Sequence, residues 1–117
     1  MADLENLAAA HLEAARANPH GRSAELILRD GVLRQSVIAL CEGAELAEHN
    51  SPDAASIQVL RGKVMITSQG DRDVQSAAGD LDVLTHHRHA VRALADSVFL
   101  LTTVTSVGQQ GGPERGA

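Results

Sequence analysis

The first apolar residues of the chain recur at the spacing of an α-helix. They form one stripe through Leu4, Leu7, Ala8, Leu12 and Ala15. Asp3 can serve as an N-cap, and Asn18 followed by Pro19 is a stop signal. The pattern predicts one amphipathic helix over residues 3–17, with its stripe against the folded domain or a neighbouring subunit. His11 is expected on the exposed surface of this helix.

From Ser23 onward the pattern changes to short runs of Val, Ile, Leu and Thr between turn residues, which is typical of an all-β barrel or sandwich. The pair Asp30-Gly31 predicts a hairpin. The expected strands lie near residues 24–28, 32–40, 44–49, 56–61, 63–68, 72–76, 82–85, 89–95 and 97–105. The final run is apolar on both faces, so it should lie centrally in a sheet or at a subunit contact.

The length of 117 residues, with 44% hydrophobic and 21% charged residues, indicates one packed domain. We expect a helix and linker over residues 1–21, a β-barrel domain over 22–106 and a disordered tail over 107–117. The tail from Gly108 onward has no apolar anchor.

The net charge of -5 and the absence of any Lys/Arg stripe argue against nucleic acid and anionic membranes as partners. Residues 1–19 lack the uninterrupted apolar stretch of a signal peptide or membrane span. Cys41 is the only cysteine, which excludes an internal disulfide and favours a cytoplasmic location and an inert thiol. Trp and Tyr are absent, so a stacking surface for a sugar is disfavoured.

Two motifs then resemble those of the cupin superfamily. The first runs from Gly43 through His49 to QVLRGKV at 58–64, and the second comprises AGDLDVL at 78–84 followed by Arg88 and His89. More closely, the chain is similar to small stand-alone bacterial cupin-domain proteins of the RmlC-like type. The resemblance implies a jelly-roll β-barrel with a central pocket, preceded here by one short N-terminal α-helix.

In metal-bearing cupins the first motif supplies two histidines and a glutamate, and the second supplies one more histidine. The resemblance places His49 and His89 at two of these positions. Ser51 stands at the second histidine, and Ala55 or Ser56 stands at the glutamate. A third ligand would have to come from Glu45, Glu48, His86 or His87. We expect no such recruitment, and therefore no tightly bound Zn, Fe, Ni or Mn.

Three functions stay open at this stage, because the fold is shared by unrelated chemistries. The first, which we favour, is a small-molecule binding or sensing barrel with a degenerate metal site, holding a small apolar ligand. Its binding residues would be His49, His89, Gln58 and Arg88. The second is a metal-dependent oxygenase or isomerase. The third is a non-catalytic structural or regulatory homodimer, because the final strand and the helix offer more apolar surface than one small barrel hides.

Overall fold

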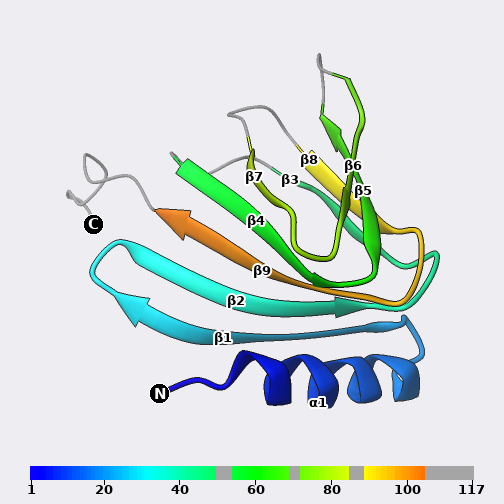
Figure 1. The fold of residues 1–117 in the computed structure, drawn as a ribbon, viewed down its shortest axis with the longest axis horizontal. Helices are drawn as coiled ribbons and strands as arrows, with labels where there is room; N and C mark the ends of the chain where they lie inside the picture. Colours follow the sequence, from blue (N-terminus) through cyan, green and yellow to red (C-terminus); the bar gives the residue numbers. More distant parts are fainter. Residues whose placement is uncertain (50–53, 69–71, 85–88, 105–117) are drawn as a thin grey trace.

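The structure is a computed structural model that describes residues 1–49, 54–68, 72–84 and 89–104. Figure 1 shows two β-sheets that come together at the β4–β5 turn and diverge toward their other ends, with one helix beneath the larger sheet. No helix in the described part of the chain is long and apolar enough to cross a membrane. The predicted tail at 107–117 lies outside the described residues.

The helix α1 spans Leu4–Ala17, as the apolar spacing predicts. The Asp3 side chain caps it by accepting a hydrogen bond from the Asn6 backbone N–H at 3.2 Å. Ala8, Leu12 and Ala15 are its buried residues, and they pack on the larger sheet. The helix contacts β1, β2 and β9, so the stripe is covered within the domain itself.

The expectation that His11 lies on the exposed surface is wrong. Its side chain is only 14% exposed, because α1 lies against β1 at this position. The Nδ1 atom lies 2.7 Å from Ser23 Oγ, and the Nε2 atom lies 2.8 Å from Glu25 Oε1. His11 therefore joins the helix to the first strand.

The nine strands lie close to the nine expected. They are β1 Arg22–Asp30, β2 Leu33–Leu40, β3 Glu45–His49, β4 Ala54–Arg61, β5 Lys63–Ser68, β6 Val74–Ala77, β7 Leu81–Leu84, β8 His89–Ala93 and β9 Ser97–Val104. The larger sheet has the order β1-β2-β9-β4-β7, and the smaller has the order β3-β8-β5-β6. Every pairing between described strands is antiparallel. This is the jelly-roll arrangement of an all-β fold.

The final strand β9 lies between β2 and β4, which explains why it is apolar on both faces. Phe99 points between the two sheets, into the interior cluster that also contains Ile57 and Val91. Val98 and Leu100 point to the opposite side, where they pack under α1. The central placement predicted for this strand is confirmed, and it needs no subunit contact. Cys41 is half-buried beside the cluster under the helix.

Candidate functional site

The space between the two sheets is lined mainly by apolar side chains. The fully buried members include Leu40, Ile57, Val59, Val64 and Phe99. Leu46, Leu84 and Leu101 pack on this cluster but are only partly buried. The interior therefore combines fully buried aliphatic side chains with a few that are less completely covered.

His89 is the one histidine that the structure places in this interior with its side chain described. It is 6% exposed and begins β8. Because alternate residues of a strand share a face, His89 lies on the same side of β8 as Val91 and Ala93, which belong to the interior cluster. A buried imidazole among aliphatic side chains is the polar group around which a site could be organised.

His49 is the direct partner of His89 in the backbone ladder between β3 and β8. Leu46 pairs with Val91 in the same ladder, so three residue steps on β3 match two on β8. The extra residue is a β-bulge, and it shifts the side-chain alternation by one. Placement of the two imidazoles on one interior face stays a prediction, because the His49 side chain lies outside the described atoms.

The same bulge removes Glu45 from the interior. Glu45 is exposed and pairs with the exposed Arg92, on the side of the smaller sheet away from Leu46 and Val91. A regular strand would have put Glu45 on the same face as His49, which was the basis for naming it as a third metal ligand. The structure does not bring Glu45 together with His89. Glu48, His86 and His87 lie outside the described side chains.

The register of β4 decides whether Ala55 or Ser56 stands at the position of the glutamate in the first cupin motif. Ala55 is half-buried and pairs with Leu84, which packs on the interior cluster, whereas Ser56 pairs with the exposed Val83. Ala55 therefore stands on the inner face, where the cupin glutamate would be, and Ser56 points outward. A methyl group offers no metal ligand.

The structure also separates Gln58 from the interior. Ile57 and Val59 are buried between the sheets, so Gln58 lies on the outer face of β4, and it is exposed. It pairs with Leu100, which packs outside the interior as well. Arg88, the fourth predicted ligand-binding residue, lies outside the described residues. Of the four predicted ligand-binding residues, His49 and His89 are the two that the structure describes as lying opposite each other in a backbone ladder.

The residues described do not fit a transition-metal centre. Within the described ranges, no group of three or more His, Cys, Asp or Glu side chains is arranged to hold an ion. His89 and Ala55 stand at two positions where metal-bearing cupins carry ligands, and Ser51 is a poor metal ligand at neutral pH.

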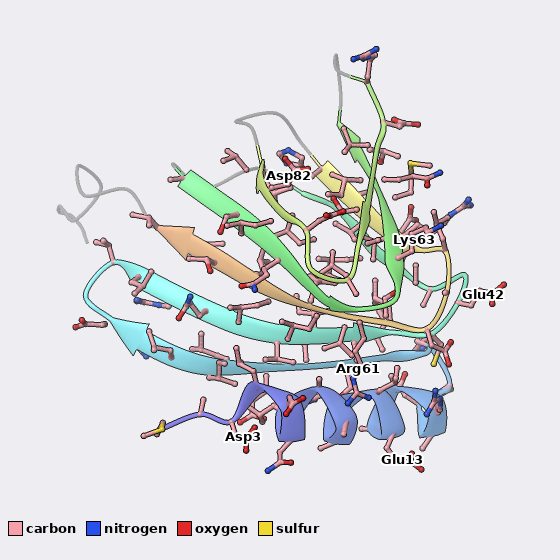
Figure 2. All side chains as sticks on the ribbon, in the orientation of Figure 1. Asp3, Glu13, Glu42, Arg61, Lys63 and Asp82 are labelled. Carbon is pink, nitrogen blue, oxygen red and sulfur yellow. The ribbon has the colours of Figure 1, made fainter. Side chains whose placement is uncertain are left out.

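One polar contact between the sheets was missed by sequence reasoning. Asp82 on β7 (labelled in Figure 2) pairs with Ile57 and so occupies an inner-face position, and its Oδ2 lies 3.5 Å from Ser76 Oγ on β6. Ser76 is 2% exposed. The sequence carries no signal for this contact, because the alternation of Leu81, Asp82 and Val83 would ordinarily place the polar side chain outward.

A concave surface lies outside the space between the two sheets, between the start of α1 and strand β1. Its volume is about 640 Å³. Leu7, Ala10, Ile27 and Leu28 give it an apolar floor, and Glu25 stands at its edge. It shares no lining residue with the interior cluster.

No protein-family model matches the chain, and no curated protein matches it. Solved structures do. A conserved protein of unknown function from Streptococcus pyogenes is 24% identical with a TM-score of 0.68, over 76% of this chain and 78% of that one. An RmlC-like cupin protein from Desulfovibrio desulfuricans is 25% identical with a TM-score of 0.63, over 71% of this chain and 81% of that one. A DMSP lyase from Ruegeria pomeroyi is 16% identical with a TM-score of 0.65, over 74% and 48%.

Proposed function

Because the chain has the cupin fold, we propose that it is a small-molecule binding or sensing barrel whose inherited metal site has degenerated. Two observations support this proposal: the buried His89 lies on the inner side of β8 in the smaller sheet, and the methyl group of Ala55 lies on the inner face of β4 in the larger sheet. The interior keeps one polar anchor of the family's site and replaces another by an apolar group.

The chemistry of the ligand follows from this lining. Leu46, Leu84 and Leu101 are the partly buried side chains that a ligand would cover further, and burial of apolar surface favours association. An imidazole can donate or accept a hydrogen bond, depending on its tautomer and protonation. The ligand class is thus a small, largely apolar molecule with one hydrogen-bonding group, such as a short aliphatic carboxylic acid or alcohol.

Amide chemical-shift mapping tests the proposal on the intact chain. Short fatty acids and alcohols, added one at a time, should shift the amide signals of Val91, Leu84 and Leu101. The apparent affinity obtained from these shifts should fall at least about tenfold in His89→Leu, because this substitution removes the polar anchor. His20→Ala is the matched control, because His20 is exposed in the turn after α1.

Shifts confined to the groove between α1 and β1 would overturn the proposal, because that groove shares no lining residue with the interior. Unchanged affinity in His89→Leu would also overturn it, provided that the variant keeps the wild-type amide spectrum elsewhere.

The metal-dependent enzyme is the second candidate function, and the direct pairing of His49 with His89 in the β3–β8 ladder favours it. Two histidines give a weak site, and a functional one needs at least a third ligand. Elemental analysis after purification without a histidine tag separates the two candidates. Stoichiometric metal that is lost in His49→Ala would place the enzyme first.

A further inference from the structure

Two arginines lie opposite each other in the hairpin formed by β1 and β2. Arg29 on β1 pairs directly with Arg34 on β2, and paired residues of antiparallel strands share a face. Like charges in this arrangement repel one another and destabilise a sheet. The chain has a net charge of -5 and only 10 Lys and Arg residues. The arginine pair is therefore a local concentration of positive charge on an acidic protein.

Both arginines occupy the inner face of the larger sheet. Alternate residues of β2 share a face, and Ile38 belongs to the interior cluster, so Arg34 lies on the inner side. On β1, the two steps from Leu26 to Leu28 match one step on β2. This β-bulge reverses the alternation of β1 and places Arg29 inward, whereas a regular strand would place it outward. Bulges commonly re-aim a side chain toward a functional site.

The arginine pair belongs to a row of residues that crosses the candidate site. Arg34 lies opposite Thr103 on β9, and Thr103 lies opposite Ala55 on β4. Ala55 in turn lies opposite Leu84 on β7. Because adjacent strands are about 5 Å apart, the backbones of Arg34 and Ala55 are about 10 Å apart on one face. The partly buried Leu101 is the next inner residue of β9 after Thr103, so the arginines border the apolar lining.

Among the described residues, neither arginine forms an ion pair with a carboxylate. Arg34 is half-buried, and its Nη1 atom donates hydrogen bonds to the carbonyls of Gly31 at 2.6 Å and Leu33 at 2.9 Å. Asp30 follows Arg29 in the chain but pairs with Leu33, at an outer-face position. The contacts described for Arg34 use Nη1 alone, and a guanidinium also has donors on Nε and Nη2.

We propose that Arg29 and Arg34 bind the carboxylate of the interior ligand, an inference that rests on the proposed binding function of the barrel. Two guanidinium groups on one face can hold one carboxylate through charge-assisted hydrogen bonds, and the anion offsets their mutual repulsion. His89 then contacts a second polar group of the ligand, and the partly buried leucines cover its apolar body. The ligand class is an aliphatic acid with a hydroxyl or carbonyl group toward its other end.

The overall charge of the chain makes a preference for acids diagnostic. A net charge of -5 repels an anion at long range. Tighter binding of an acid than of an uncharged molecule of the same length therefore requires a local group of cations. The arginine pair is such a group on the inner face of the larger sheet.

Amide chemical-shift titration of the full chain at neutral pH tests the proposal with two matched series of probes. The first is ω-hydroxy acids of roughly six to ten carbons, and the second is α,ω-diols of the same lengths, which replace the carboxylate by a hydroxyl. The best acid should bind at least about tenfold more tightly than its diol and should shift the Thr103 amide signal. Arg29→Gln and Arg34→Gln should each reduce this preference at least about fivefold and leave diol affinity unchanged.

Arg29→Gln keeps the two hairpin hydrogen bonds of Arg34, so it tests the site even where Arg34→Gln disturbs the fold. The matched control is Arg61→Gln, which removes the same charge from an exposed position opposite Val98 on the outer face (Figure 2). It should leave the preference for acids unchanged.

The possible failures of the two proposals are distinguishable. Equal affinity for acid and diol in the wild-type protein overturns the carboxylate site alone. So does a preference for acids that survives Arg29→Gln and a folded Arg34→Gln, or that falls equally in Arg61→Gln. If no acid or diol binds, the proposed function of the interior fails and the carboxylate site fails with it.

Discussion

Gly62 lies directly against Ser97, at the point where the two sheets come together. Gly62 adopts a φ of +81°, and an added Cβ atom would overlap the Ser97 hydroxyl and the Asp96 carbonyl, with the Ser97 Cα at 2.8 Å. The buried Ser97 Oγ accepts a hydrogen bond from the Lys63 backbone N–H at 3.0 Å. The turn between β4 and β5 is thereby held to the start of β9.

Gly62→Ala should therefore be strongly destabilising. The left-handed backbone costs an L-residue about 1–2 kcal/mol, and overlap with backbone atoms adds roughly as much again. Gly31→Ala is the control, because Gly31 also has a positive φ of +56° but has no atom within 4 Å of the added Cβ. In urea unfolding, Gly62→Ala should lower the free energy of unfolding at least twice as much as Gly31→Ala does. Equal losses of free energy would contradict the packing described.

Metal removal should have little effect on stability. Because Ala55 stands on the inner face and Glu45 lies outside, the interior lacks these carboxylate ligands, and little free energy of metal binding can be linked to folding. Protein purified without a histidine tag should contain well under one equivalent of zinc, iron, nickel or manganese by elemental analysis, and a chelator should leave the melting temperature unchanged. A large fall in melting temperature with chelator would show that a third ligand has been recruited from Glu48, His86 or His87.

Asp96 should make stability depend on acid pH. Its carboxylate accepts hydrogen bonds from the Glu42 backbone N–H at 2.8 Å and from Arg16 Nε at 3.1 Å, which lower its pKa from the ordinary 3.8. Because the folded pKa is the lower one, the stabilisation is complete above the unfolded pKa and is lost as pH falls through the folded value.

The matched variant for this effect is Asp96→Asn. The difference in free energy of unfolding between wild type and variant should be constant above about pH 5 and shrink below about pH 4. Its size should not exceed about 1 kcal/mol, since the Asp96 side chain is 36% exposed. A difference that grows toward low pH would have the wrong sign.

Removal of the His11 side chain should loosen α1 from β1. His11→Ala leaves Ser23 and Glu25 without their imidazole contacts, at an expected cost of about 1 kcal/mol. The control is His20→Ala, at an exposed turn position, which should change stability by less than about half that amount. Hydrogen exchange of the helix amides measures the effect locally, and equal protection in both variants would refute the role of His11.

Periodicity was enough to predict α1 and all nine strands, because burial on one face imposes a spacing of 3.6 or 2 residues that local composition displays. The cupin fold was implied by the resemblance of the motifs around His49 and His89 to those of the cupin superfamily, and not by periodicity. The fit of Ser97 against Gly62 is a contact between distant segments, and no local pattern contains it.

The candidate site depended on register, which a single strand does not display. The bulge between Leu46 and His49 moved Glu45 outside, and the pairing of β4 with β7 placed Ala55 inward and Gln58 outward. Each of these outcomes follows from which residue lies opposite which across a ladder. A shift of one residue exchanges the two faces of a strand. Local sequence therefore predicts that a strand forms, whereas tertiary pairing decides which of its side chains enter the interior and which, like Leu81 and Val83, remain outside.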